Sequence, residues 1–259
     1  MPIKVGIVGL GAIGNYLVDR ILESDEIVLS AVYDISQERY EELRGRLKST
    51  PPLKPPDSFP ADTDVFVECA SIEAVDGVVK EACKRGKIVI VASIGAIVDN
   101  PELIEEVMKS AAKMILPSGA IGGLDILKAI DKEDIEIVEL TTRKHPRSLS
   151  GVKIDDSGTE VEVFNGSAGE AIKLFPKNIN VAATLSLAGI GFDRTRVRII
   201  ADPKSEHNVH QIKIRSKCGN YSITCENYPF ERNPATSKLA AQSIWAALKS
   251  INDKIVVGL

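Results

Sequence analysis

The sequence predicts an α/β protein in which a parallel sheet, covered by helices on both faces, is followed by a second, α+β domain. Up to about residue 120, short β-branched segments alternate with segments of helical periodicity, which is typical of a parallel sheet. The later segments are mostly strand-like. The length of 259 residues allows two small domains. We expect one domain to comprise residues 1–119 and 234–259, and the other residues 120–233.

Apolar periodicity places the elements of the first domain. Strands are expected where β-branched residues cluster, and helices where apolar residues recur every three to four positions. Prolines between residues 51 and 60 mark a loop, and Asn100-Pro101 has the arrangement of an N-cap followed by proline at the first helical position. The expected strands are 4–8, 27–32, 64–69, 87–92 and 113–116, with helices near 13–22, 37–48 and 74–84 and another opening at 100.

The second domain is expected to be rich in strands. The last two strands read as a hairpin around Gly219-Asn220. Asn233 is a plausible N-cap of a final helix that begins at Pro234, and its apolar stripe is expected to return to the first domain. The expected strands are 135–143, 161–165, 196–201, 210–215 and 221–225.

Composition excludes several functional classes. Hydrophobic residues make up 44% and charged residues 26%, the balance of a soluble globular protein. The longest apolar run, 88–98, is too short for a membrane helix, and the N-terminus shows no export signal, so we expect a cytoplasmic location. A net charge of −4 without a basic stripe argues against nucleic-acid binding. The four cysteines show no CxxC spacing, so no metal site is expected.

A glycine-rich motif, GLGAIG at residues 9–14, follows the first expected strand and precedes the first expected helix. An acidic residue, Asp34, ends the next strand 20 residues after Gly14 (34 − 14). This combination is the fingerprint of a Rossmann domain, in which the glycines admit a dinucleotide pyrophosphate and the helix N-terminus stabilises its charge. A carboxylate at position 34 favours NAD over NADP, while Arg39 nearby leaves NADP possible. The expected cofactor-binding residues here are Gly9, Gly11, Ala12, Ile13, Gly14 and Asp34.

Three further segments are candidates for facing the cofactor. Ala70 and Ser71 follow the third expected strand, at the edge of a parallel sheet where ligands bind, although Ser71 also fits a helix N-cap. The small-residue segment 117–125 fits either a domain hinge or a backbone that approaches a bound ring closely. Asn180 either caps an apolar helix or holds the nicotinamide carboxamide.

The candidates for acid–base chemistry and substrate binding lie in the second domain. Asn208 and His210 are two residues apart and therefore share one face of a strand. A histidine changes charge near neutral pH, as acid–base catalysis requires, but the pattern alone favours a solvent-facing residue. The basic segment 141–146 either holds a dicarboxylate through Lys144 or Arg143 or is a solvated turn.

Taken together, these segments resemble the L-aspartate dehydrogenase family. SGAIGGLD followed by FPxNxNVAAT and NxH is far more selective than the glycine motif. On this resemblance, the family's active-site histidine falls on His210, and its cofactor-contacting alanine and asparagine fall on Ala120 and Asn180. His145 stands where family members often have a proline. The matching segments, in order over nearly the whole chain, are VGIVGLGAIG, VFVECAS, SGAIGGLD, TTRKHP, FPKNINVAATLSLAG, ADPKSEHNVHQI and NPATSKLAAQS.

The resemblance implies a Rossmann domain plus an α+β catalytic and dimerisation domain, assembled as a homodimer. It implies NAD(P)-dependent oxidation of L-aspartate to iminoaspartate, which hydrolyses to oxaloacetate and ammonia, and a supply of iminoaspartate to quinolinate synthase in NAD biosynthesis. We expect catalysis by His210 and substrate binding by Lys144 and Asn208. Two alternatives remain: a related NAD(P)-dependent dehydrogenase or reductase acting on another small amino acid or metabolite, and a non-catalytic NAD-sensing protein.

Overall fold

The computed structural model describes residues 1–149, 158–175, 180–230 and 233–258, and the chain forms two compact units. The first unit comprises Met1–Pro117 and Ile244–Asn252, and the second comprises Ser118–Ser243 and Asp253–Leu259. The predicted fold class, a Rossmann-type parallel sheet followed by an α+β unit, is confirmed.

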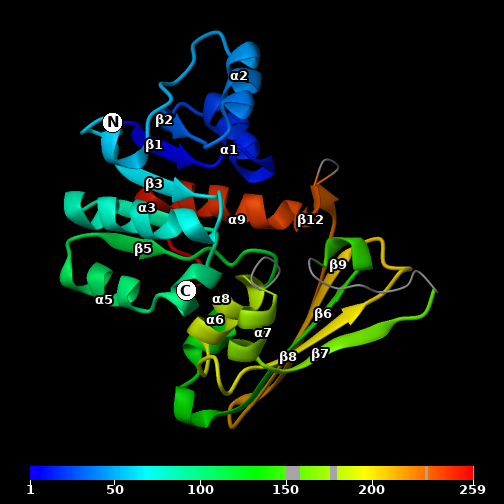
Figure 1. Cartoon of the computed structure of the whole chain (residues 1–259). Coiled ribbons are helices and arrows are strands. Elements are labelled where there is room, and N and C mark those ends of the chain that lie inside the picture. The colour runs from blue at the N-terminus through cyan, green and yellow to red at the C-terminus, as the bar shows by residue number, and fades with distance from the viewer. Residues whose placement is uncertain (150–157, 176–179, 231–232, 259) are drawn as a thin grey trace. The chain divides into compact units, whose positions relative to one another are not determined.

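The first unit contains a five-stranded parallel sheet in the order β2-β1-β3-β4-β5 (Figure 1). Because all strands are parallel, their carboxyl ends meet at one edge, which is where open α/β sheets bind ligands. The strands are β1 (Ile3–Val8), β2 (Ile27–Tyr33), β3 (Val65–Glu68), β4 (Ile88–Val91) and β5 (Lys113–Ile115).

Helices cover both faces of this sheet, so the strands are buried on both sides. One core cluster combines Val65 and Val67 of β3 with residues of α1 and α9, and the other places Phe66 against α3. Gly6 is required because the Phe59 ring occupies the place of a Cβ. The helices are α1 (Ala12–Leu22), α2 (Gln37–Arg46), α3 (Ile72–Arg85), α4 (Gly95–Asp99) and α5 (Glu102–Lys109), with the 3-10 turns η1 (Pro56–Ser58) and η4 (Ser250–Asn252).

The predicted start of the fourth long helix is wrong. The apolar run after β4 continues into a short helix, α4, that ends at Asp99. Asn100 follows it with a non-helical backbone (φ −135°, ψ 76°), and Pro101 occupies the N-cap position of α5. A continuous apolar run cannot by itself distinguish a buried strand from a short buried helix.

The second unit contains a mixed sheet in the order β10-β9-β6-β8-β7, and α6, α7 and α8 lie on one side of it (Figure 1). Side chains of β6 and β9 alternate between buried and exposed, so one face of the sheet is covered. The elements are α6 (Leu124–Ala129), η2 (Lys132–Asp134), β6 (Ile135–Lys144), η3 (Pro146–Ser148), β7 (Val161–Ser167), α7 (Ala168–Leu174), α8 (Asn180–Ala188), β8 (Arg196–Ala201), β9 (Asn208–Ser216) and β10 (Gly219–Asn227).

The hairpin of β9 and β10 is confirmed, but its turn is not at Gly219-Asn220. Ser216 pairs directly with Gly219, so the turn residues are Lys217 and Cys218. Gly219 has φ +155°, close to extended backbone, and opens β10. All four cysteines are free thiols.

The final helix begins later than predicted. Asn233–Ser237 forms β12, which pairs with β11 (Pro229–Phe230), and α9 spans Lys238–Lys249. The segment that was predicted to be the first helical turn is therefore a strand, because it pairs with β11. The predicted return of the apolar stripe is confirmed, because Ile244, Trp245 and Leu248 join the core of the first unit. Within the described residues no helix is long and apolar enough to span a membrane.

Candidate functional site

The turn between β1 and α1 has the backbone that a dinucleotide requires. Gly9 has φ +103°, and a Cβ there would lie 2.7 Å from backbone atoms of Ala70. A Cβ at Gly14 would overlap the Gly9 carbonyl oxygen, so this glycine allows α1 to pack against the turn. A Cβ at Gly11 would meet no protein atom within 4 Å. The space beside Gly11 therefore fits a pyrophosphate.

The N-terminus of α1 opens at this turn. Gly11 occupies the N-cap position and supplies no side-chain cap, and the first turn contains no acidic residue. The amides at Ala12 and Ile13 therefore keep the partial positive charge of a helix N-terminus. This arrangement binds phosphate groups in other Rossmann domains, and the residues present fit NAD(P).

Asp34, buried at the end of β2, is bonded to the same turn. Its carboxylate accepts hydrogen bonds from Leu10 N at 2.7 Å and from Ser36 N at 2.8 Å. Arg39 Nη1 lies 3.4 Å from the carboxylate, and the Arg39 side chain is 55% exposed. The Arg39 guanidinium therefore lies beside Asp34, where a cation would suit the 2′-phosphate of NADP.

We expect Asp34→Ala to weaken NAD more than NADP. The change removes a carboxylate that can accept ribose hydroxyls and also removes its repulsion of a 2′-phosphate. The loss for NAD should be roughly 10- to 100-fold, the range of a hydrogen bond to a charged group. The measurement is the Kd of NADH and of NADPH by fluorescence titration. Equal losses for both would remove the ribose role, and Asp34→Asn is the control that keeps an acceptor for Leu10 N.

A buried glutamate that sequence reasoning missed organises the loop after β3. Glu68 Oε1 accepts hydrogen bonds from Ala70 N at 2.8 Å and from Ser71 N at 3.0 Å. These two amides are therefore not donors to a cofactor, and contacts from this loop must use other atoms. The Ser71 side chain does not cap α3. The signal for Glu68 was an acidic residue at the end of an otherwise apolar strand, VFVE.

Cys69, between Glu68 and Ala70, is a packed thiol. Its Sγ donates to the carbonyl oxygens of Val8 and Gly9. Burial raises the pKa of Cys69 well above its ordinary value, and the charges of Glu68 and Asp34 add to the rise. A thiol in this environment is not a nucleophile.

In the second unit, strand register gathers the predicted catalytic and substrate-binding residues on one covered face. Thr142 of β6 and Cys225 of β10 lie directly opposite His210 of β9. Lys144 follows Thr142 by two residues, and Asn208 precedes His210 by two. Because β6 and β9 are antiparallel, these two side chains extend the same face in the same direction.

His210 is buried rather than solvent-facing, with 2% of its surface exposed. Its Nδ1 lies 3.0 Å from Thr142 Oγ1, so the hydroxyl fixes the ring orientation. Burial lowers the pKa of His210 to about 3, and the positive charge of Lys144 contributes. In the free protein the imidazole is therefore neutral at physiological pH.

Lys144 and Arg143, neighbours in sequence, point to opposite faces of β6. Lys144 is 6% exposed, and burial lowers its pKa to about 8. It has no acidic partner among the described residues, whereas Arg143 forms ion pairs with Glu160 and Asp202. A buried cation without a counter-ion favours an anionic ligand. Of the two predicted candidates, the geometry favours Lys144.

Asn227, a second residue that sequence reasoning missed, links the segment around Ala120 to this face. Its Nδ2 donates to the Ala120 carbonyl oxygen at 3.0 Å and lies 3.4 Å from the Asn208 carbonyl oxygen. Asn208 Nδ2 in turn lies 3.4 Å from Ser237 Oγ. All four residues are buried. Asn227 ends β10, and asparagine is common where a strand gives way to a turn, so no sequence signal identified this residue.

We expect Asn227→Asp to lower the stability of the second unit by about 1–3 kcal/mol, because an acceptor replaces the buried donor to Ala120. It should also raise the KM for NAD if Ala120 contacts the cofactor. Thermal unfolding and steady-state kinetics measure the two effects. Asn220→Asp, at an exposed position of the same strand, is the matched control, and equal effects of the two changes would contradict the link.

Asn180 is the first residue of α8, and its carbonyl oxygen accepts from Thr184 Oγ1 at 2.9 Å. Residues 176–179, which complete the predicted FPKN segment, lie outside the described residues. The cofactor role of Asn180 therefore stays a prediction.

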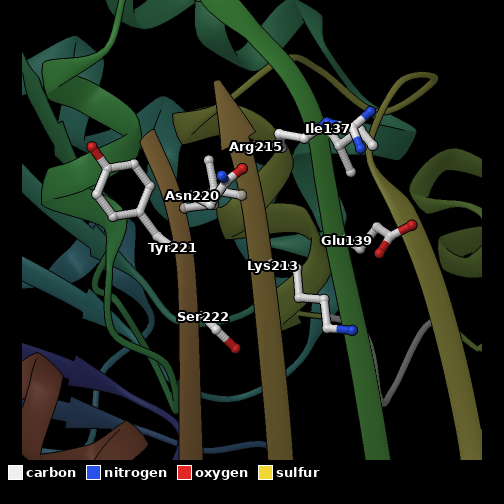
Figure 2. A pocket seen from close by; sticks show the side chains of 8 residues that line it. Ile137, Glu139, Lys213, Arg215, Asn220, Tyr221 and Ser222 are labelled. Atoms are coloured by element: carbon white, nitrogen blue, oxygen red, sulfur yellow. The ribbon is translucent and has the colours of Figure 1, made fainter. Parts of the chain in front are cut away.

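Two surface pockets flank the sheet of the second unit. One, of ≈ 290 Å³, lies on the face opposite His210 and is lined by Glu139, Lys213 and Arg215 among others (Figure 2). The other, of ≈ 240 Å³, reaches Asn208 and is lined by His145, Arg147, Ser148, Ser205, Glu206, His207 and Pro229 as well. The second pocket thus adjoins the predicted substrate-binding residue. No cluster of three or more potential metal ligands occurs in the described part of the chain.

Comparison with known proteins agrees with this geometry. A family profile described as aspartate dehydrogenase, C-terminal, matches residues 125–251, and one described as homoserine dehydrogenase, NAD binding domain, matches residues 9–117. The L-aspartate dehydrogenase of Methanothermobacter thermautotrophicus is 43% identical over 260 residues, with 98% of each chain covered. That of Methanococcoides burtonii is 40% identical over 269 residues, with 99% of each chain covered.

Solved structures give the same result. The crystal structure of aspartate dehydrogenase from Thermotoga maritima matches with a TM-score of 0.77 and 34% identity, covering 100% of both chains. A homoserine dehydrogenase from Thiobacillus denitrificans matches with a TM-score of 0.63 at 17% identity, covering 96% of this chain and 72% of that one, which shows the shared fold alone. With full-length relatives well above 30% identity, this chain belongs to the L-aspartate dehydrogenase family.

Proposed function

We propose that the protein oxidises L-aspartate to iminoaspartate with NAD(P), and that the imine then hydrolyses to oxaloacetate and ammonia. The observation that carries this proposal is the pairing of a buried cation, Lys144, with a buried neutral imidazole, His210, on one face of the second sheet. When bound, the nicotinamide of NAD(P) accepts the hydride that leaves the substrate Cα. The names of the full-length relatives supply the substrate.

His210 is proposed as the acid–base group. A neutral imidazole can take the proton of the substrate ammonium, which must leave before the amine becomes an imine. Burial is the main cause of the low pKa of His210, and a carboxylate bound beside Lys144 would offset the smaller contribution of that cation, so substrate binding raises the basicity of the ring. Thr142 holds the ring through Nδ1, which leaves Nε2 as the reacting atom.

Lys144 is proposed to bind one substrate carboxylate, with Asn208 beside it. The pocket that adjoins Asn208 carries Arg147, whose positive charge and hydrogen-bond donors suit a second carboxylate. A site of this kind distinguishes a dicarboxylate from an uncharged amino acid of the same length. Alanine and asparagine should therefore be poor substrates.

The direct test is a spectrophotometric assay of purified protein with L-aspartate and NAD or NADP, repeated in reverse with oxaloacetate, ammonia and NADH. Absorbance at the nicotinamide band should rise in the first assay and fall in the second. L-alanine and L-asparagine serve as substrate controls. A faster reaction with another amino acid would favour a related dehydrogenase, and cofactor binding without any turnover would favour an NAD-sensing protein.

The biological setting is also a proposal. Iminoaspartate supplied by this reaction would pass to quinolinate synthase in NAD biosynthesis, as the resemblance implies. The four free thiols are consistent with a reducing compartment and support the cytoplasm. We propose a homodimer, so light scattering should give about twice the chain mass of 28.0 kDa.

A further inference from the structure

The carboxyl edge of the first sheet contains a buried carboxylate that the proposed chemistry does not use. Glu68 is 0% exposed at the end of β3. Besides the amides of Ala70 and Ser71, it accepts hydrogen bonds from Ser93 N at 2.9 Å and from Ser93 Oγ at 3.0 Å. One side chain thus holds the loops that follow two neighbouring strands, β3 and β4.

Burial of the Glu68 carboxylate costs free energy, and packing of the side chain does not explain why a glutamate is used here. Burial raises its pKa, while the four hydrogen bonds oppose the rise, and no lysine or arginine among the described residues forms an ion pair with it. A buried carboxylate without a counter-ion destabilises a fold unless its hydrogen bonds are complete. An apolar residue at this position would leave the amides of Ala70, Ser71 and Ser93 without this acceptor, so the use of a glutamate points to the loops that it holds.

Strand order locates these loops relative to the cofactor. Asp34 ends β2 and marks the adenosine ribose, and the glycine turn ends β1 and marks the pyrophosphate. In the order β2-β1-β3-β4-β5, the loops that Glu68 holds lie on the far side of the turn from Asp34. An extended dinucleotide that crosses the edge from Asp34 therefore places its nicotinamide half over the loops of Ala70 and Ser93.

We propose that Glu68 is a positioning residue for the nicotinamide half of the cofactor. It acts through Ala70, Ser71 and Ser93, whose backbone it fixes with their amides turned inward. The loop that carries Ala70 also lies against Gly9: a Cβ added at Gly9 would be only 2.7 Å from the Ala70 backbone. The surface presented to the nicotinamide is therefore set before the cofactor binds. This role rests on the proposed cofactor site but not on the identity of the substrate.

The test compares two ligands that share the adenosine and pyrophosphate groups. ADP-ribose lacks nicotinamide, whereas NADH carries it. In Glu68→Gln, the amide NH2 faces at least one backbone N–H in either orientation, so the loops should shift. We expect the Kd of NADH to rise roughly tenfold and that of ADP-ribose to change by less than about twofold. Calorimetry or fluorescence titration measures both.

Two further variants keep the test decisive. Ser93→Ala removes one donor and leaves the carboxylate, so it should shift the NADH Kd in the same direction by roughly threefold even if Glu68→Gln fails to fold. Glu81→Gln is the matched control, because Glu81 is also buried in this unit but pairs with Arg85 on α3. It should lower stability without changing the Kd ratio of the two ligands.

The outcomes separate this role from the proposed function. Equal losses for NADH and ADP-ribose, or no loss for either, would overturn the positioning role. If Glu68→Gln lost NADH affinity selectively while the wild-type protein failed to oxidise aspartate, the positioning role of Glu68 would be supported and the substrate assignment refuted. A wild-type protein that binds neither ligand would overturn both.

Discussion

His210→Ala should lower kcat by roughly 10²- to 10⁴-fold, the usual contribution of a positioned acid–base group, and leave the Kd of NADH nearly unchanged. The imidazole is buried, neutral and held by Thr142, so it is placed to take the proton of the substrate ammonium. Lys144, with a pKa of about 8, is mainly a cation near neutral pH and is therefore assigned to carboxylate binding. Stopped-flow measurement of NADH formation gives the rate, and fluorescence titration gives the Kd.

Two variants serve as controls for this loss. Gln211→Ala changes the next residue of β9, which is exposed on the opposite face, and should leave turnover within about twofold, as surface changes usually do. Thr142→Val removes the hydroxyl that orients the ring and should give an intermediate loss of roughly tenfold. If His210→Ala retained turnover within a few-fold of wild type, the acid–base assignment would be wrong.

Lys144→Met should raise the KM for aspartate by roughly 100-fold, because removal of one partner of a buried charge pair costs about 2–5 kcal/mol. The pH dependence of kcat/KM in the wild-type protein should also show the titration of Lys144. Lys144 is protonated below its pKa of about 8 and loses its charge as the pH rises through that value. The value of kcat/KM for aspartate should therefore fall above about pH 8, since kcat/KM reports groups of the free enzyme.

A variant that keeps the charge of Lys144, and one that removes the charge of its neighbour, distinguish substrate binding by Lys144 from a structural role. Lys144→Arg retains a cation at all accessible pH values, so its alkaline fall should move to higher pH. Arg143→Gln changes the neighbouring residue, which points to the other face and pairs with Glu160 and Asp202, and should leave the KM nearly unchanged. A normal KM in Lys144→Met, or a KM that rises equally in Arg143→Gln, would contradict the assignment.

Local patterns predicted much of this molecule. The strand, glycine turn and helix of residues 3–22 follow from short-range steric rules, and so does Asp34 at the end of the next strand. Alternation along β9 correctly predicted that Asn208 and His210 share a face. The resemblance to the L-aspartate dehydrogenase family, built on ordered motifs, is confirmed by full-length relatives.

The features that could not be predicted from the sequence depend on contacts between residues that are distant along the chain. Which face of β9 is covered is decided by helices and by β6, so the burial of His210 and its low pKa were not predictable locally. Glu68 and Asn227 act through hydrogen bonds to loops 25 and 107 residues away. The start of α9 was missed because pairing with β11 overrides the local preference of an Asn-Pro dipeptide for a helix start.

The most direct test of the proposed oxidation of L-aspartate is the fate of the hydrogen on the substrate Cα. The protein should be incubated with NAD and L-aspartate deuterated at Cα, and the reduced cofactor analysed by mass spectrometry. We expect NADH that carries one deuterium, formed in step with oxaloacetate and ammonia. Reduced cofactor without deuterium, or no reduced cofactor at all, would contradict it.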